Sequence, residues 1–350
     1  MTATPSSRRQ ADEPDVSVIV LTINGQERLP VCLGALHNSG LAVQVVLVDN
    51  GSTDSTVDRA RGSWPDVDVI SNAVNEGFAG GCNQGAEVAR GRYLLFLNDD
   101  ALVGPSTLLE LVRAADADAI GAVWQPPILS ADGLRWDSAG SMFTGAGLLW
   151  HDAADLMVAD APRGDRRIFA AKGACLLVRR SSFEEVGGFD ASFFAYYEET
   201  DLCWRLALRG HAIRLVAAAA PVLHVGGVTA GGLFDVTELD FMFFRNRLTS
   251  ILTLPGPRTL ASVLPLHLGA IGGLLLVALM TGHHARARGI WQAVLWVPRH
   301  RRLLSARRRR IQSTRLATDD EVFAGVTQAP PLRAVAAAAW GYLGNRSSAV

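Results

Sequence analysis

Three carboxylates, Glu198, Glu199 and Asp201, lie close together in one short segment of the chain. Exposed helices often begin with acidic residues, because the helix dipole stabilises a carboxylate at that end. Four aromatic residues directly before this cluster are unusual for an exposed helix start, and a carboxylate in such a setting can act as a general base. We therefore predict that the three acids are candidate catalytic residues. The aromatic residues are Phe193, Phe194, Tyr196 and Tyr197.

A second acidic cluster, Asn98-Asp99-Asp100, directly follows the apolar run of residues 93–97. The two aspartates alone are also what a solvated turn would show. Their place after a buried strand favours a metal site, because Mg²⁺ and similar hard cations prefer carboxylate and diphosphate oxygens as ligands. We predict that a divalent cation, Mn²⁺ or Mg²⁺, binds here.

Short apolar runs alternate with helical segments in the first part of the chain. This alternation predicts an α/β fold with a mostly parallel sheet and helices on both faces. Ligands bind beyond the carboxyl ends of the strands in such sheets, which is where Thr22, Asp49 and Asp99 fall. Asp49 with Asn50 is compatible with a simple turn or with hydrogen bonds to a nucleotide base or ribose. The predicted strands cover residues 16–21, 43–48, 67–70 and 93–97.

His224 follows an apolar run, with Gly226 and Gly227 just beyond it. A single histidine is more often a core or loop residue than a ligand. Its position beside two glycines, which permit a close backbone approach, makes a ligand role plausible. The glycines of residues 77–85 lack the G-x-G-x-x-G spacing of dinucleotide-binding proteins, which argues against a nicotinamide enzyme.

Charge is distributed unevenly along the chain, although the net charge of its 350 residues is only -1. Residues 1–240 hold 31 of the 34 acidic and 18 of the 33 basic side chains, whereas residues 241–318 contain 13 arginines and no acid. This change predicts a boundary near residue 240 and a second part that meets an anionic surface. The four cysteines form no CxxC pair, so neither a zinc site nor a disulfide framework is predicted. The polar residues 1–15 are predicted to be a disordered leader.

The run from Leu260 to Met280 has the length and polarity of a transmembrane helix. Arginines flank it on both sides, so the positive-inside rule assigns no orientation, and spanning, re-entry and lying flat all stay open. Further along, tryptophans and leucines are interleaved with arginines, which suits the lipid headgroup level better than nucleic acid. We predict an anionic membrane surface as partner and no nucleic acid, with membrane-associating helices over residues 251–318 and a tail over 319–350.

Taken in this order, the motifs resemble those of glycosyltransferase family 2 with the GT-A fold, and more narrowly those of its bacterial rhamnosyltransferase branch. The resemblance covers about residues 15–250, so we expect one GT-A nucleotide-sugar-binding domain over residues 16–250. The motifs that carry it are residues 48–54 (VDNGSTD), 75–85 (NEGFAGGCNQG), 97–100 (LNDD), 187–190 (GGFD), 197–205 (YEETDLCWR), 224–227 (HVGG) and 245–247 (RNR).

The resemblance implies a nucleotide-sugar site at the carboxyl edge of the sheet. In the family an Asp after the second strand binds the nucleotide base and the end of the first strand contacts it, which points here to Asp49 and Thr22. The residues expected to bind the nucleotide sugar are Thr22, Asn24, Asp49, Asn50, Asn75, Gly77, Phe78, Asn83, Asn98, Asp99, Lys172 and Arg205.

The resemblance also implies a metal site and a catalytic base. The family's D-x-D motif falls on Asn98-Asp99-Asp100, which makes Asp100 the main metal ligand and leaves Asp99 for ribose or metal. His224 matches a histidine that serves as a further metal ligand in relatives. The family's base motif ends at Glu199, where Glu replaces the usual Asp, so Glu199 is the expected base.

These expectations combine into an inverting, metal-dependent glycosyltransferase with Mn²⁺ or Mg²⁺ as cofactor. The resemblance implies dTDP-L-rhamnose as donor and a polyprenyl-diphosphate-linked or polysaccharide acceptor in cell-envelope glycan synthesis. The expected location is the cytoplasmic face of the cell membrane, peripheral or with one membrane-inserted helix. Two alternatives stay open: galactosyl, mannosyl or N-acetylglucosaminyl transfer by the same fold, and a catalytically silent nucleotide-sugar-binding protein.

Overall fold

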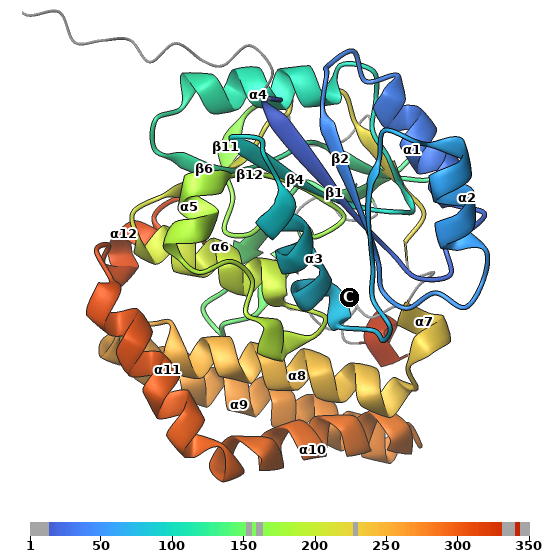
Figure 1. The fold of residues 1–350 in the computed structure, drawn as a ribbon. Coiled ribbons are helices and arrows are strands. Elements are labelled where there is room, and N and C mark those ends of the chain that lie inside the picture. Colours follow the sequence, from blue (N-terminus) through green and yellow to red (C-terminus); the bar gives the residue numbers. More distant parts are fainter. Residues whose placement is uncertain (1–13, 152–155, 159–163, 227–229, 331–339, 344–350) are drawn as a thin grey trace, which may run out of the picture.

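The computed structural model describes residues 14–151, 156–158, 164–226, 230–330 and 340–343. A large sheet with helices on both faces forms its centre (Figure 1). Its strands, in spatial order, are β11 (Arg166–Arg167), β13 (Ala212–Leu215), β6 (Gly121–Gln125), β12 (Cys175–Arg179), β4 (Tyr93–Asn98), β1 (Val16–Thr22), β2 (Gln44–Asp49) and β3 (Asp68–Ser71). All of them run in one direction except β11 and β12. The predicted α/β fold with a mostly parallel sheet is therefore confirmed.

Strand β1 is apolar along its length because both of its faces are buried. Val18 and Val20 pack into a cluster with helices α1 (Leu29–His37) and α4 (Thr107–Ala117). Ile19 packs on the opposite face, which is covered by α3 (Gly77–Val88), α5 (Arg180–Glu185) and α6 (Glu198–Leu208). Helix α3 approaches β1 closely at Gly85, where a Cβ atom would lie 2.5 Å from Ile19 Cγ2. Helix α2 (Thr56–Ser63) connects β2 to β3.

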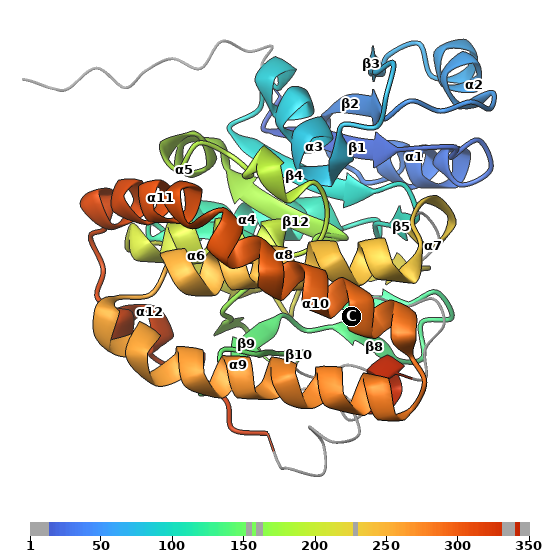
Figure 2. The same cartoon turned by 90° about the horizontal axis from the view of Figure 1, so that it is seen from below.

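A second, four-stranded sheet joins segments that are far apart in the sequence. Its order is β5 (Ala101–Leu102), β14 (Val222–His224), β7 (Ile128–Ser130) and β8 (Trp136–Ser138). In this sheet His224 lies opposite Ala101, and Ser138 lies opposite Ile128. The acidic turn after β4 is thereby brought next to His224. A separate pair, β9 (Ser141–Phe143) and β10 (Leu149–His151), lies below it (Figure 2).

The C-terminal helices form a layer under the main sheet (Figures 1 and 2). In this layer α8 packs against α9, α10 and α11. Helix α12 places Phe323 in the main core, 4.6 Å from the ring of Phe143. The helices after β14 are α7 (Ala230–Leu233), α8 (Val236–Thr253), α9 (Pro257–Met280), α10 (His284–Arg299), α11 (Arg301–Thr314) and α12 (Asp319–Phe323), and a short 3-10 helix, η2, covers Ala191–Phe193.

The predicted ends of the chain fall partly outside the described residues. Most of the predicted leader, residues 1–13, lies there, while the Asp15 carboxylate forms an ion pair of 2.7 Å with Arg92. Of the predicted tail, residues 331–339 and 344–350 also lie outside. The division into a domain over residues 16–250 and a following membrane-associating part stays a prediction.

Candidate active site

A chain of alternating charges runs through the second sheet. His224 lies 3.4 Å from Asp100 through Nε2, and its Nδ1 lies 2.7 Å from Asp137 Oδ2. Lys172 continues the chain, because its Nζ donates to Asp137 Oδ1 at 2.7 Å. His224 and Asp100 are both buried. The site thus combines two carboxylates, an imidazole and an ammonium group from four separate segments.

The neighbours in this chain shift each other's pKa values. Burial opposes the charged form of His224, but its hydrogen bonds to Asp100 and Asp137 raise its pKa to about 9. Burial also opposes ionisation of Asp137, yet His224 and Lys172 lower the pKa of that carboxyl to about 2. The pKa of Asp100 lies below its usual range for the same reason, because His224 outweighs the effect of burial. These shifts favour a positive charge on His224 and negative charges on Asp100 and Asp137 near neutral pH.

Asp100 and His224 fit a divalent cation that is held together with a diphosphate. Mg²⁺ usually takes one or two carboxylates, and substrate phosphates and waters complete its shell. His224 Nδ1 already contacts Asp137, which is the partner arrangement that orients an imidazole toward a metal. Among the described residues, no group of three or more His, Cys, Asp or Glu side chains is arranged to hold an ion by itself. Asp100 and His224 therefore fit a divalent cation only if oxygens of a bound diphosphate complete its coordination shell.

Asp99 faces away from His224 and toward the end of β1. Its carboxylate accepts a hydrogen bond of 2.6 Å from Thr22 Oγ1 and pairs with Arg28 Nη2 at 2.9 Å. Burial raises the pKa of Asp99, although Arg28 and Thr22 act in the opposite direction. Of the three residues predicted to bind metal, the structure therefore brings together Asp100 and His224 and gives Asp99 other partners.

Part of the set predicted to bind the nucleotide sugar lies along the carboxyl edge of β1, β2 and β3, namely Thr22, Asp49, Asn50, Asn75 and Gly77. The Asp49 carboxylate accepts hydrogen bonds from Ser52 and Ser71. Asn50 donates to Asn75 Oδ1 at 3.1 Å and to the Gly77 carbonyl at 3.0 Å. These contacts hold the loops after β2 and β3 together beside Thr22. Side-chain hydrogen bonds therefore connect the loops at the carboxyl edge of the sheet.

Four other predicted nucleotide-sugar residues have protein partners of their own. Asn24 accepts a hydrogen bond of 2.9 Å from the Thr53 N–H, and its backbone has a left-handed φ of 48°. Asn83 bonds both the N–H and the carbonyl of Phe189. Asn98 ends β4, where its N–H donates to the Ala174 carbonyl. The donors of Arg205 are directed to Asp201 and to two backbone carbonyls, away from this edge.

The loop before α6 holds an unusual backbone. Phe194, Tyr196 and Tyr197 have φ values of 65°, 68° and 72°, which side-chain-bearing residues rarely adopt. Asn246 on α8 holds this loop, because its Nδ2 donates to the carbonyls of Phe193, Ala195 and Tyr196 at 2.7 to 2.9 Å. Backbone strain of this kind persists only when the surroundings stabilise it and is frequent at functional sites.

Glu199 lies on the same side as Lys172. A Cβ atom at Gly173, the neighbour of Lys172, would lie 3.9 Å from Glu199 Oε2, and the Lys172 charge acts on this carboxyl. Burial nevertheless raises the pKa of Glu199 above its usual value. Glu198 is only 5% exposed and lies toward Cys82 of α3, and its Oε2 has no hydrogen-bond partner among the described residues.

Asp201, the third predicted catalytic acid, is fully buried in an ion cluster. Its carboxylate pairs with Arg205 Nε at 2.7 Å and accepts two hydrogen bonds from Arg307 Nη2 at 2.7 and 2.8 Å. Ser250 donates a further one at 2.7 Å. Arg307 also contacts Asp190 at 3.0 Å. Asp201 therefore anchors α6 to α8 and α11, and it is not directed toward Glu199.

The sequence model described as Glycosyl transferase family 2 matches residues 17–187. The chain has a glycosyl transferase family 2 domain. It is 31% identical over 204 residues to an N-acetylglucosaminyl-diphospho-decaprenol L-rhamnosyltransferase of Mycobacterium tuberculosis. The aligned residues cover 52% of this chain and 66% of that protein. It is 27% identical to a low-salt glycan biosynthesis hexosyltransferase of Haloferax volcanii, and that alignment covers 55% of this chain and 61% of the relative. The chain thus spans less than two thirds of these relatives.

Solved structures share the fold of this family 2 domain at low sequence identity. A crystal structure of residues 1–349 of S. aureus TarS has a TM-score of 0.54 and 18% identity, and covers 86% of this chain and 89% of that one. The crystal structure of GalNAc-T7 with UDP, GalNAc and Mn²⁺ has a TM-score of 0.53 and 16% identity, and the match covers 69% of this chain and 48% of that one. These likenesses confirm the predicted GT-A fold.

Three residues of the site were not found from the sequence. Asp137 bonds His224, Arg28 bonds Asp99, and Arg307 bonds Asp201. Asp137 lies in a short strand without a recognisable motif, and Arg307 belongs to an arginine run that was assigned to a membrane surface. Because each of these contacts joins distant segments, no local sequence signal marks it.

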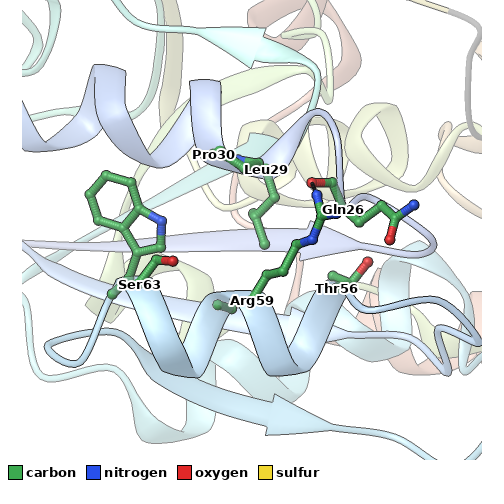
Figure 3. Close-up of a pocket in the computed structure, with 8 residues that line it drawn as sticks. Gln26, Leu29, Pro30, Thr56, Arg59 and Ser63 are labelled. Carbon is green, nitrogen blue, oxygen red and sulfur yellow. Dashed lines mark hydrogen bonds between the residues drawn. The ribbon is translucent and has the colours of Figure 1, made fainter.

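A pocket of about 400 Å³ lies between α1 and α2, apart from this site (Figure 3). Leu29 and Pro30 of α1 face Arg59 of α2 across it. None of the residues predicted to bind the nucleotide sugar lines this pocket. We therefore do not assign the donor to it.

The ion cluster around Asp201 predicts a stability difference between two arginines of α11. Arg307→Met leaves the buried Asp201 and the partly buried Asp190 short of a partner. Breaking the buried pair with Asp201 costs about 3 to 5 kcal/mol. Chemical denaturation should show this loss of unfolding free energy. The matched control is Arg309→Met, because Arg309 is exposed on the same helix. Equal stability of the two variants would contradict the proposed anchor.

Proposed function

We propose that this protein is an inverting glycosyltransferase that moves a sugar from a nucleoside diphosphate donor to an acceptor hydroxyl. The observation that carries the proposal is the position of Glu199 beside Lys172 and Gly173, next to the chain that includes Asp100 and His224. A base and a site for a diphosphate are then adjacent. The family 2 domain and the activities named for the relatives support the same reaction.

In the proposed reaction Glu199 takes the proton of the acceptor hydroxyl. The hydroxyl oxygen attacks the anomeric carbon from the face opposite the leaving group. As this bond forms, the bond from the anomeric carbon to the diphosphate oxygen breaks, and the nucleoside diphosphate leaves with the electron pair. The configuration at the anomeric carbon is therefore inverted. Lys172 lies near enough to Glu199 to favour the ionised base.

The proposal includes Mn²⁺ or Mg²⁺ as cofactor. Asp100 and His224 would hold the ion, and Asp137 would orient the imidazole through Nδ1. When bound, the cation neutralises negative charge on the departing diphosphate. Asp99 would keep its place on Thr22 and Arg28, where it supports the end of β1.

L-Rhamnose is the sugar that we propose for transfer. The mycobacterial relative is named for L-rhamnosyl transfer to a decaprenyl-diphosphate-linked acceptor. Phe78 adds support, because its ring would lie 3.8 Å from a Cβ at Gly173, the same position that Glu199 approaches. A 6-deoxy sugar carries a methyl group where hexoses carry a hydroxymethyl group, so an apolar wall beside the base suits it.

A donor comparison tests the proposed function. With one lipid-linked acceptor, kcat/KM for dTDP-L-rhamnose should exceed that for UDP-galactose, UDP-N-acetylglucosamine and GDP-mannose by about tenfold, which is about 1.4 kcal/mol of transition-state binding. If a UDP- or GDP-sugar leads, the rhamnosyl assignment fails while glycosyl transfer stands. Binding without turnover for every donor would instead support a silent nucleotide-sugar-binding protein.

The base assignment predicts that Glu199→Gln lowers kcat by about 10² to 10⁴ while donor binding is retained. Glu198→Gln and Asp201→Asn serve as comparisons, and a more severe loss of chemistry in either would show that the base is misassigned. Since burial raises the pKa of Glu199, its carboxyl gains a proton as the pH falls through that pKa. The wild-type kcat should therefore decrease toward acidic pH, in single-turnover measurements as well.

The metal assignment predicts that excess EDTA abolishes transfer and that Mn²⁺ or Mg²⁺ restores it. Asp100→Ala should lose most of the activity at saturating metal, because it removes the carboxylate that faces His224. Full turnover in excess EDTA would rule the proposed cofactor out.

We further propose that the protein works against an anionic membrane surface, at the cytoplasmic face. Helix α9 is long and apolar enough to cross a membrane by length and composition, with 24 residues and a mean hydropathy of 2.2 in its best window, of which 22% is buried. A buried stripe including Val263, His267 and Ile271 packs it against the protein. Its other face exposes leucines 266, 268, 276 and 279, and large apolar patches of this kind usually mark an interaction site. Because α9 packs against α8 and α10, this arrangement favours a helix lying flat on the bilayer.

Sedimentation with phosphatidylglycerol-containing vesicles tests this surface. Replacing Leu266, Leu276 and Leu279 by Gln together should reduce binding by at least about tenfold, because each buried leucine contributes about 1.5 to 3 kcal/mol. The matched control replaces three exposed apolar residues elsewhere, Val74, Ile120 and Leu134, by Gln. Equal vesicle binding by both triple variants would contradict the assignment of this face.

A further inference from the structure

The three residues Arg245-Asn246-Arg247 on α8 have different environments. Arg245 and Asn246 donate to backbone carbonyls of the strained loop before α6. Arg247 does not take part in this clamp. It is only 9% exposed, and its Nε and Nη2 have no hydrogen-bond partner among the described residues. Two guanidinium donor atoms are therefore buried and free to bind a ligand.

No carboxylate of the described residues acts on the Arg247 charge. The groups that do so are the phenols of Tyr197 and Tyr342, while burial alone lowers its pKa. An arginine does not lose its proton in a protein, so Arg247 is a buried cation that forms no ion pair with the part of the chain that the structure describes. Such a charge is costly unless an anion compensates it. The environment of Arg247 is thus that of an anion-binding group.

Two further buried polar atoms near Arg247 also lack a partner among the described residues. One is the hydroxyl of Tyr197, from the strained loop, and the other is Nε2 of His267, on α9. The ring of Phe243 lies 5.7 Å from the Arg247 guanidinium and 6.3 Å from the ring of Tyr197. His267 Nδ1 lies 3.0 Å from the Ala146 carbonyl and must donate to it, so Nε2 of this ring is an acceptor. Of the two atoms, the Tyr197 hydroxyl is therefore the one that can donate to an anion beside Arg247.

This position lies next to the base. Tyr197 is two residues before Glu199 in the chain, and the charges of both Arg247 and Glu199 act on the pKa of its phenol. On another side, His151 senses Arg247 together with Lys172 and Asp137. Asp100 and His224 pair with each other and with Asp137, and among the described residues no ion pair joins either of them to Arg247. We therefore assign Arg247 to an anion other than the donor diphosphate proposed for that pair.

We propose that Arg247 binds the diphosphate of a prenyl-diphosphate-linked acceptor. The inference rests on the proposed function for the reaction in which this acceptor takes part. The planar guanidinium offers parallel N–H donors that match phosphate oxygens. His267 belongs to α9, the helix whose outer face is apolar and exposed, so the prenyl chain has an apolar surface to follow beyond the diphosphate. The acceptor sugar then extends toward Glu199.

Calorimetry on the full-length protein in detergent tests this assignment, with farnesyl diphosphate as the probe. Arg247→Met should weaken its binding at least tenfold, because the guanidinium that compensates the phosphate charge is removed. The affinity of Arg247→Lys for farnesyl diphosphate should lie between those of Arg247→Met and the wild type, since lysine keeps the charge and lacks the planar guanidinium group. The exposed Arg309→Met is the matched control and should bind as the wild type does. Equal affinity of Arg247→Met and wild type would overturn the proposal.

Three further measurements distinguish a lipid-linked diphosphate from free pyrophosphate, the acceptor site from the donor site, and ligand binding from a purely structural role of Arg247. Inorganic pyrophosphate should bind the wild type far more weakly than farnesyl diphosphate, and equal binding would overturn the lipid-linked assignment. dTDP and UDP should bind Arg247→Met unchanged, whereas their loss would place Arg247 in the donor site. The thermal midpoint of Arg247→Met should equal or exceed that of the wild type, because Arg247 forms no ion pair with the described residues and its burial is unfavourable. A clear fall would reveal a structural role and overturn the proposal.

The binding readout also separates this inference from the proposed function. If no donor is turned over but farnesyl diphosphate binding still depends on Arg247, then glycosyl transfer fails and the prenyl diphosphate site stands. If transfer occurs and its KM for a prenyl-diphosphate-linked acceptor is unchanged in Arg247→Met, then the site fails and the reaction stands.

Discussion

The buried carboxylate of Asp201 is the interaction on which the rest of this structure depends. Two guanidinium groups, from Arg205 on its own helix and from Arg307 on α11, pair with it in a water-poor interior. A buried charge cluster of this kind is stable only when every partner is present. The arginine-rich C-terminal part is therefore joined to the helix that begins with Glu198 and Glu199, and the uneven charge along the chain has a structural role in the folded protein.

Helix α6, which carries the proposed base, is held at its start by a second set of contacts. Three left-handed residues precede it, and Asn246 of α8 satisfies three carbonyls of that loop with one amide group. The resulting backbone turns Glu199 toward Lys172 and leaves Glu198 beneath α3. Two neighbouring acids of the same type thus acquire different environments. Burial raises the pKa of both carboxyls, and Glu199 differs by the nearby Lys172 charge, which opposes that rise.

The C-terminal helical layer has two distinct faces. Its inner face supplies Asn246, which bonds the loop before α6, Arg307, which bonds Asp201 of α6, and the buried Arg247. Its outer face, on α9, exposes leucines that the described residues do not cover. One layer therefore connects the site to an apolar surface. This arrangement is suited to an acceptor whose sugar is soluble and whose anchor is not.

The sequence by itself determined the parallel strands and their polar ends. The predicted runs 16–21, 43–48, 67–70 and 93–97 differ from β1 to β4 by a residue or so at their ends, because a strand buried on both faces is written locally as a continuous apolar run. The tertiary structure decided which polar groups meet. It directed Asp99 to Arg28, joined Asp137 to His224 and buried Arg307 against Asp201, and it left Nε and Nη2 of Arg247 without a hydrogen-bond partner among the described residues. Hydropathy is a local property of a segment, whereas an ion pair depends on two segments that only folding brings together.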